Sequence, residues 1–260
     1  MREYSRPAKV EVSSEARLPD TVFARAVEEP AAIALRRQES GQWRDVTCKE
    51  FRDDVAALAK ALIAVGIEHG DRIALMSRTR YEWTTIDYAI WAVGAVTVPI
   101  YETSSEEQVE WILGDSGSKA VFVESPEHAA RVEAVRSDLK DLQYVWQIDG
   151  SALAEFTASG ADVEDSVVEQ RRTAGGIDEL ATLIYTSGTT GRPKGCELTH
   201  RNLLFTILNI INGPLEEVFT LEGRSTLLFL PLAHSFARII QVGCIESKTV
   251  LGHFPTTGPE

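Results

Sequence analysis

Apolar and polar residues repeat along the chain with the period of an α-helix in some stretches and form short continuous runs in others. The clearest helical stretch carries apolar residues at steps of four and three: Phe51, Val55, Leu58, Leu62 and Val65. One face of a helix has this spacing. Thr47 and Glu50 precede the stretch with the spacing of a capping box, and Gly66 follows it as a natural stop. The pattern therefore predicts an amphipathic helix between Thr47 and Gly66.

Short apolar runs and helical patterns alternate after this helix. The runs predict strands at residues 72–76, 96–101, 120–123, 144–148 and 181–185, with helices between the first four. Residues 104–108 offer two overlapping capping boxes for one of these helices. Strands that are apolar throughout and separated by helices are typical of a parallel sheet covered on both faces. The expected fold class is therefore α/β, with parallel-rich sheets flanked by helices.

Further elements are expected at both ends of the chain. Residues 18–27 predict a helix, and residues 33–37 and 43–46 predict a hairpin. After Thr199, the pattern predicts a helix at 200–211, a strand at 227–230, a helix after Pro231 and a strand at 249–254. We expect residues 1–17 to form a tail. The acidic stretch 151–176 is expected to be a surface connector between two lobes of the unit 18–260.

Composition narrows the functional classes. The 260 residues are 44% hydrophobic and 25% charged, which excludes disordered chains, collagen-like repeats and coiled coils. The formal net charge of -13 argues against a nucleic-acid partner, because it repels phosphate backbones. No apolar run approaches the ~20 residues of a membrane span, and the polar start does not resemble a signal peptide. Three scattered cysteines indicate reduced thiols, so we expect a cytoplasmic protein.

The most unusual segment follows the predicted strand at 181–185. Residues 186–195 read Thr-Ser-Gly-Thr-Thr-Gly-Arg-Pro-Lys-Gly. Glycines let successive backbone amides turn toward one anion, the hydroxyl groups add hydrogen-bond donors, and Lys194 adds a positive charge. These groups together favour binding of a polyphosphate. The alternative is a flexible surface loop, which explains any three of these residues better than it explains all ten.

Two other phosphate-binding motifs do not match this segment. A Walker A loop needs a glycine, four further residues and then Gly-Lys-Ser/Thr, and no glycine here satisfies that spacing, which disfavours a P-loop kinase. No Gly-x-Gly-x-x-Gly sequence opens a helix, which weakens a dinucleotide-binding interpretation.

Residues 184–200, which contain this segment, resemble the phosphate-binding signature of the AMP-forming adenylating enzymes, the ANL superfamily. Residues 230–238, 78–83 and 99–103 resemble its long-chain branch, the long-chain fatty-acid–CoA ligases or acyl-CoA synthetases. The resemblance covers nearly the whole chain from Leu18 onward. It implies an enzyme that uses ATP and Mg²⁺ to convert a fatty acid to acyl-AMP and then transfers the acyl group to coenzyme A.

The resemblance assigns roles to individual residues. The ATP phosphates would be bound by Thr186, Ser187, Gly188, Thr189, Thr190, Gly191 and Lys194. Thr186 would also offer its hydroxyl to Mg²⁺, and Lys194 would neutralise the departing pyrophosphate. His234 would lie beside the α-phosphate and the acyl group, so Lys194 and His234 are the candidate catalytic residues. Phe236 and Arg238 would line or brace the acyl pocket.

Several of these residues also have purely structural interpretations. Thr186 could be an ordinary strand-end threonine, and His234 could be a helix-start or core residue. Phe236 and Cys196 are expected to be packing residues. Tryptophans at helical spacing within apolar stripes are expected in the core: Trp83, Trp91 and Trp111.

The resemblance also implies parts that have no counterpart before Glu260, among them the adenine pocket and a small C-terminal domain with a catalytic lysine. We therefore expect residues 18–260 to be the N-terminal part of an AMP-binding (adenylation) domain, with the C-terminal domain absent and the chain inactive by itself. The alternative is a non-catalytic nucleotide- or acyl-binding module derived from such a ligase. Unpaired edges at strands 227–230 and 249–254 predict a homo-oligomer. An acyl substrate is also compatible with a peripheral membrane contact.

Overall fold

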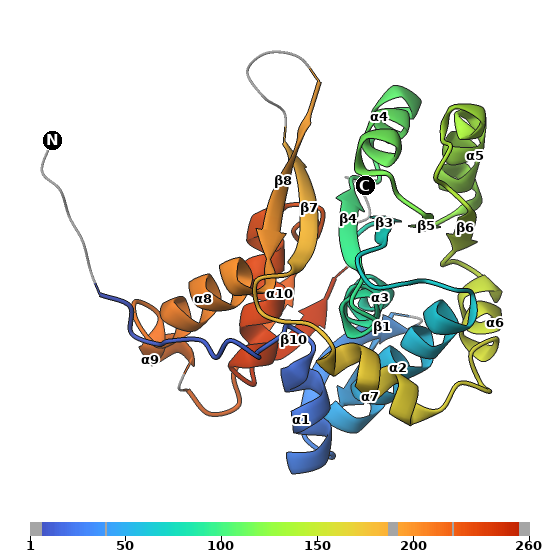
Figure 1. Cartoon of the computed structure of the whole chain (residues 1–260). Helices are drawn as coiled ribbons and strands as arrows, with labels where there is room; N and C mark the ends of the chain where they lie inside the picture. Colours follow the sequence, from blue (N-terminus) through green and yellow to red (C-terminus); the bar gives the residue numbers. More distant parts are fainter. Residues whose placement is uncertain (1–6, 40, 187–191, 220, 255–260) are drawn as a thin grey trace, which may run out of the picture.

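The computed structural model describes residues 7–39, 41–186, 192–219 and 221–254, and they form two β-sheets with helices packed around them (Figure 1). The larger sheet has six strands in the order β6-β5-β3-β4-β7-β8. The strands are β3 (Arg72–Met76), β4 (Val96–Ile100), β5 (Ala120–Val123), β6 (Tyr144–Gln147), β7 (Leu180–Thr186) and β8 (Lys194–Thr199). Every neighbouring pair is parallel except β7 and β8. The predicted α/β class is confirmed.

Helices cover both faces of this sheet. They are α2 (Cys48–Ala64), α3 (Tyr81–Ala92), α4 (Glu106–Ser116), α5 (Pro126–Ala134), α6 (Ala152–Ala158) and α7 (Asp165–Thr173), with a 3-10 turn at Arg136–Asp138. Alternate residues of β3 belong to different cores. Ile73 and Leu75 pack with α2 and α3, whereas Ala74 and Met76 pack with α4 and α5. Because a strand between two helical layers is buried on both sides, β3 is apolar at nearly every position.

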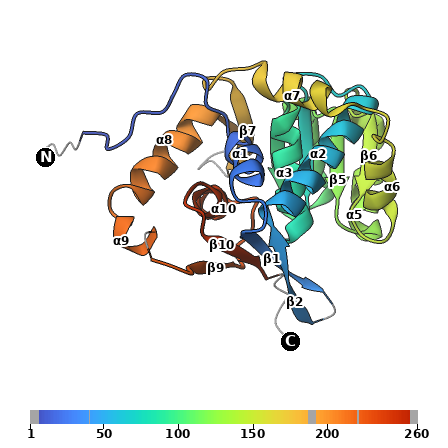
Figure 2. The same cartoon turned by 90° about the horizontal axis from the view of Figure 1, so that it is seen from below.

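The smaller sheet combines the two ends of the chain. Its order is β2-β1-β10-β9, with β1 (Ile33–Glu39), β2 (Gln42–Thr47), β9 (Ser225–Leu228) and β10 (Val250–His253). The remaining helices are α1 (Asp20–Glu28), α8 (His200–Ile211), α9 (Glu216–Phe219) and α10 (Ser235–Glu246). Helix α10 lies between α8 and strands β9 and β10 (Figure 2).

The expectation that both C-terminal strands have an unpaired edge is wrong for the strand at 249–254. Strand β10 is paired on both sides, because β1, more than 200 residues earlier, runs parallel to it with Leu35 opposite Leu251. In the described part of the chain, β9 is the last strand of its sheet.

Local signals locate the helix starts correctly. At α2, the Thr47 hydroxyl accepts a hydrogen bond from the Glu50 amide at 3.1 Å, and the Glu50 carboxylate accepts one from the Thr47 amide at 2.8 Å. Equivalent capping boxes form at Ser105 and Thr199.

The acidic stretch 151–176 contains α6 and α7, whose Phe156 and Val168 join the main core. No helix in the described ranges is long and apolar enough to cross a membrane.

Candidate functional site

The hydroxyl- and glycine-rich segment connects β7 to β8. The last pair of this antiparallel hairpin is Thr186 opposite Lys194, and both residues are exposed. Strand β7 runs parallel to β4, so the hairpin tip lies at the edge where the parallel strands end, which is where open α/β sheets bind ligands. Five of the predicted phosphate ligands lie outside the described residues: Ser187, Gly188, Thr189, Thr190 and Gly191.

Cys196, which we expected to be a packing residue, is exposed instead. It lies on β8, where its Sγ is 3.9 Å from the Thr186 hydroxyl across the hairpin. The expectation fails because β8 is the terminal strand of the larger sheet in the described part of the chain, and its outer residues have no covering layer. The thiol therefore faces the same side of the hairpin as Thr186.

His234 lies at the start of α10, on a different element from the hairpin. It is the N-cap residue, and its Nδ1 accepts a hydrogen bond from the Phe236 amide at 3.2 Å. An acceptor nitrogen carries no proton, so the neutral ring carries its proton on Nε2. Because His234 is exposed, this N–H can donate to a ligand. The helix-start alternative is thus correct, and it leaves the ring available for chemistry.

Thr79 fixes the turn that leads to His234, a role that the sequence did not reveal. Its hydroxyl donates to the carbonyl of Leu230 at 2.6 Å and accepts from the amide of Leu232 at 3.2 Å. Thr79 follows β3, about 150 residues earlier in the chain, and is itself buried. The signal that could have found it is its place within residues 78–83, a segment that resembles the long-chain branch.

A buried arginine connects α10 to helix α3 and to the hairpin strand. Arg238 donates to both carboxylate oxygens of Asp87 on α3, at 2.6 and 2.9 Å, and to the Thr182 hydroxyl on β7 at 2.7 Å. Arg238 and Asp87 are both fully buried. Burial lowers the pKa of Arg238 and raises that of Asp87, while the attraction between the two charges opposes both shifts. Through its bond to Thr182, Arg238 therefore connects the helix of His234 to the strand of Thr186.

Two predicted core tryptophans hold this ion pair. Trp83 and Trp91 are fully buried, and their ring centres lie 5.3 and 5.1 Å from the Arg238 guanidinium carbon. Arg238 is thus a buried residue that joins α10 to α3 and β7, and its expected role at an acyl pocket stays a prediction. Phe236, in contrast, was expected to pack, but its side chain is 55% exposed. Its position in the first turn of α10, beside His234, places it outside the core.

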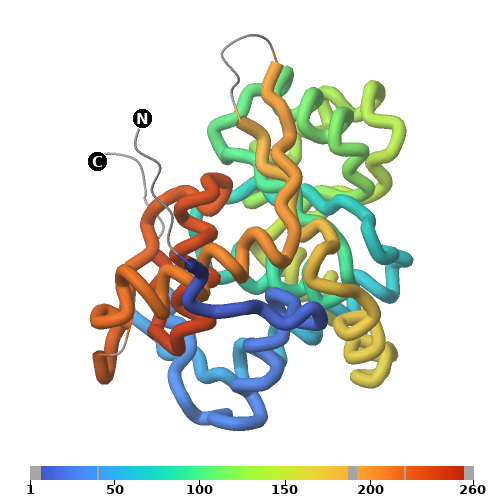
Figure 3. The backbone as a smooth tube through the Cα atoms, turned by 60° about the vertical axis from the view of Figure 1, so that its left-hand side comes forward, coloured from blue at the N-terminus to red at the C-terminus, as the bar shows by residue number. Residues whose placement is uncertain are grey.

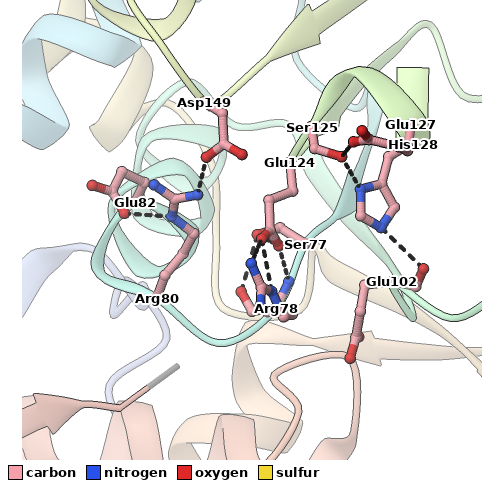
Figure 4. Close-up of polar contacts among 10 residues, drawn as sticks. All are labelled: Ser77, Arg78, Arg80, Glu82, Glu102, Glu124, Ser125, Glu127, His128 and Asp149. Atoms are coloured by element: carbon pink, nitrogen blue, oxygen red, sulfur yellow. Dashed lines mark hydrogen bonds and ion pairs between the residues drawn. The ribbon is translucent and has the colours of Figure 1, made fainter. Parts of the chain in front are cut away.

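A separate polar cluster lies where β3, β5 and β6 end (Figure 4). The buried Glu124 accepts hydrogen bonds from the Arg78 guanidinium at 2.5 and 2.8 Å and from the Ser77 hydroxyl at 3.0 Å. Burial disfavours the Glu124 carboxylate, but these donors outweigh that effect and hold its pKa below the usual range. The Arg80 guanidinium donates hydrogen bonds to the carboxylates of Glu82, at 2.7 Å, and Asp149, at 2.6 Å. Because these charges neutralise one another, the cluster does not provide a positive site for phosphate.

No cluster of His, Cys, Asp and Glu side chains suited to a metal ion occurs among the residues that the structure describes.

Comparison with known proteins gives consistent matches over nearly the whole chain. Residues 22–253 match the family described as AMP-binding enzyme. The chain is 43% identical over 255 residues to the long-chain-fatty-acid–CoA ligases FadD15 of Mycobacterium bovis and Mycobacterium tuberculosis. The alignment covers 97% of this chain and 42% of each relative, so the chain spans less than half of their length.

Solved structures show the same fold. The inhibitor-bound N-terminal domain of FACL13 from Mycobacterium tuberculosis matches with a TM-score of 0.78 and 27% identity, over 93% of this chain and 58% of that one. A Mycobacterium tuberculosis fatty acyl CoA synthetase matches with a TM-score of 0.77 and 26% identity, over 93% and 45% of the two chains.

Proposed function

The chain belongs to the AMP-binding enzyme family, and on that premise we propose that it is the N-terminal part of the adenylation domain of a long-chain fatty-acid–CoA ligase. In the proposed reaction, a fatty-acid carboxylate attacks the α-phosphate of ATP, which gives acyl-AMP and pyrophosphate. The thiol of coenzyme A then attacks the acyl-adenylate, which gives acyl-CoA and AMP. Residues 18–260 would contribute the phosphate loop and one wall of the acyl site, and residues 1–17 a tail.

The hairpin tip carries this proposal. We assign the β- and γ-phosphates of ATP to the residues of the loop: Thr186, Ser187, Gly188, Thr189, Thr190, Gly191 and Lys194. The observation in support is that Thr186 and Lys194 face each other at the end of the hairpin, exposed, with a hydroxyl on one strand and a cation on the other. Hydrogen bonds to charged phosphate are each worth about 1.5–3 kcal/mol, so several donors that converge there can outweigh the negative charge of the whole chain.

Thr186 is also the proposed ligand of Mg²⁺. Its hydroxyl is exposed and makes a long contact, 3.9 Å, to the Cys196 sulfur, so an oxygen lone pair is available to a hard cation. Mg²⁺ bound there would neutralise charge on the phosphates, and ATP oxygens and water would complete its ligands. The contribution of this chain is to hold the hydroxyl at the end of a paired strand.

His234 and its neighbours are assigned to the reacting end of the substrates. The Nε2–H of His234 would donate to the fatty-acid carboxylate or to an α-phosphate oxygen, which favours charge that develops in the adenylation step. Phe236, two residues later and exposed, would contact the acyl chain. Thr79 and Arg238 touch neither substrate in this scheme and act as positioning residues.

Location and assembly are part of the same proposal. The three cysteines are free thiols in the structure, and free thiols are typical of proteins under reducing conditions, which supports a cytoplasmic location. Leu227 and Phe229 are about half exposed beside the outer edge of β9, which supports self-association through that edge. The same exposed apolar side chains could also meet a membrane surface that delivers fatty acid.

Direct titration tests the phosphate assignment. Magnesium pyrophosphate and MgATP are added to the purified 260-residue chain, and binding is followed by calorimetry. We expect saturable binding of both ligands and no fatty-acid-dependent ATP–pyrophosphate exchange by the chain alone, because the resemblance assigns essential groups to other parts of such ligases. Lack of binding would contradict the loop assignment, and robust exchange would contradict the expected inactivity. Binding of ATP by a protein that never supports exchange in any longer context would favour the alternative, a non-catalytic binding module.

A further inference from the structure

The end of the β7–β8 hairpin extends past its neighbour in the sheet. Strand β4 pairs with β7 through Thr97 and Thr182, four residues before Thr186, and β4 itself ends at Ile100. The hairpin therefore projects above the sheet, and α4 stands next to it (Figures 1 and 3). Backbone pairing with β4 does not reach the residues beside the loop, so other contacts must hold them in place.

Helix α4 contacts both legs of the hairpin through side chains on one face. On the β7 leg, the Tyr185 hydroxyl donates to the Asp115 carboxylate at 2.6 Å. On the β8 leg, the Trp111 indole N–H donates to the carbonyl of Pro193 at 2.8 Å. Trp111 and Asp115 are four residues apart, which places them on the same side of the helix, one turn apart. These bonds involve residues directly adjacent to Thr186 and Lys194.

Stacking and close packing reinforce the two hydrogen bonds. The guanidinium carbon of Arg192 lies 4.7 Å from the Trp111 ring centre, within the range of a cation–π interaction. The Tyr185 ring lies across Gly195, where a Cβ atom would be 3.2 Å from the ring. Gly195 thus leaves room for the ring to reach Asp115. The ring of Pro193 fixes its φ angle, which reduces the freedom of the backbone next to the carbonyl that Trp111 binds.

Helix α4 is a firm support for these contacts. Its Val109 and Leu113 are buried against β3, β4 and β5 in the second core. The capping box of Ser105 holds its first turn, and the left-handed Gly117 ends it, with the Gly117 carbonyl bonded to Arg72 at 3.1 Å. Trp111, expected to be a core residue, is only partly buried, because its polar edge reaches out to the hairpin.

We propose that Trp111 and Asp115 of α4 are positioning residues that hold the two legs of the phosphate loop at the separation needed to bind the phosphates of ATP. This inference rests on the proposed function of the loop. Neither side chain touches the ligand. Each limits the movement of a backbone segment that carries a ligand-binding residue, so less ordering is required when the anion binds.

The test combines hydrogen exchange with pyrophosphate binding in three variants of the 260-residue chain. Trp111→Phe removes the indole N–H and keeps a ring, and Tyr185→Phe removes the hydroxyl that Asp115 accepts. Glu106→Gln, at an exposed position on the first turn of α4, is the matched control. We expect Trp111→Phe and Tyr185→Phe each to accelerate amide exchange at residues 185, 186, 192, 194 and 195, the positions beside the loop that carry an amide hydrogen. We also expect each to weaken magnesium pyrophosphate binding by about threefold to tenfold, the range for loss of one hydrogen bond.

Exchange should accelerate far more at the hairpin than in β3 in both variants, since a merely destabilised protein would change everywhere. Faster exchange at the hairpin without weaker binding would overturn the positioning role, and so would unchanged exchange. If the wild-type chain itself binds no pyrophosphate, the proposed function of the loop fails, and the exchange measurements separately decide whether α4 holds the hairpin.

Discussion

Replacing Arg238 by methionine tests the buried connection between α10 and β7. The substitution keeps an unbranched side chain of similar length between Trp83 and Trp91 but leaves the Asp87 carboxylate buried without its cation. Asp87 would retain its bonds from Thr97 at 2.7 Å and from Gln241 at 3.0 Å, which compensate in part. Removing one partner of a buried ion pair typically costs about 3–5 kcal/mol, which is a large fraction of the 5–15 kcal/mol that stabilises a typical domain.

Urea unfolding followed by circular dichroism measures this loss, and pH identifies its origin. In Arg238→Met, the pKa of Asp87 in the folded state should lie well above its unfolded value of about 3.9. A folded state that binds the extra proton becomes more stable relative to the unfolded state as the pH falls. The deficit should therefore be largest near pH 7 and shrink toward pH 4. The double variant Asp87→Leu/Arg238→Met, which leaves no buried charge, should recover most of the loss.

Two results would refute this reasoning. A loss below about 1 kcal/mol in Arg238→Met would mean that the ion pair is not the main support of α10. A deficit that stays constant between pH 7 and pH 4 would mean that the lost packing, and not the unpaired carboxylate, accounts for the destabilisation.

Three further substitutions test other parts of the structure. Thr79→Val should destabilise the chain by about 1–3 kcal/mol, because it leaves the Leu230 carbonyl and the Leu232 amide without their partner. Urea unfolding measures this loss, and a value near zero would contradict the role of the hydroxyl. Burial raises the pKa of Glu246 to about 7, with Asp20 adding to the effect and Thr21 and Arg25 opposing it. The folded state therefore retains a proton that the unfolded state loses near pH 4.5, so stability from this group is present at low pH and lost as the pH rises toward 7. Glu246→Gln should lose roughly 1–3 kcal/mol less unfolding free energy than the wild type between pH 4.5 and pH 7. Parallel changes of wild type and variant in urea unfolding across this pH range would exclude a raised pKa of Glu246. Lys194→Ala should weaken magnesium pyrophosphate binding at least tenfold by calorimetry, whereas the exposed Lys140→Ala should not; equal effects would show that general surface charge is responsible.

Features that depend on neighbouring residues could be predicted from the sequence. The capping box at Thr47 and the strand at 72–76 are set by residues a few positions apart, and the structure confirms both. The segment 186–195 could be identified as unusual because its glycines, hydroxyl groups and lysine are contiguous. The structure confirms the strand before it and shows that a second strand, β8, follows it, which the sequence did not predict.

Features that depend on distant residues could not be predicted in this way. The parallel pairing of β1 with β10 and the ion pair of Asp87 with Arg238 join segments about 150 or more residues apart, and no local pattern specifies such partners. Trp111 was expected in the core because its helical spacing places it on an apolar face. That spacing does not show that its indole N–H reaches the Pro193 carbonyl. Cys196 and Phe236 were expected to be packing residues, yet each is exposed, because whether a layer covers a position depends on distant parts of the chain.

The central claim, that this chain provides the phosphate loop of an adenylating enzyme, is tested most directly by ATP–pyrophosphate exchange in a chimeric ligase. This chain replaces the matching segment of the Mycobacterium tuberculosis FadD15 ligase, with which it shares 43% identity over 255 residues. We predict fatty-acid-dependent exchange that Lys194→Ala reduces more than tenfold and Lys140→Ala leaves intact. Transfer of a supplied acyl-adenylate to coenzyme A should survive both substitutions, which shows that the chimera is folded. A chimera that transfers the acyl group but supports no exchange, or whose exchange is indifferent to Lys194→Ala, would contradict the claim.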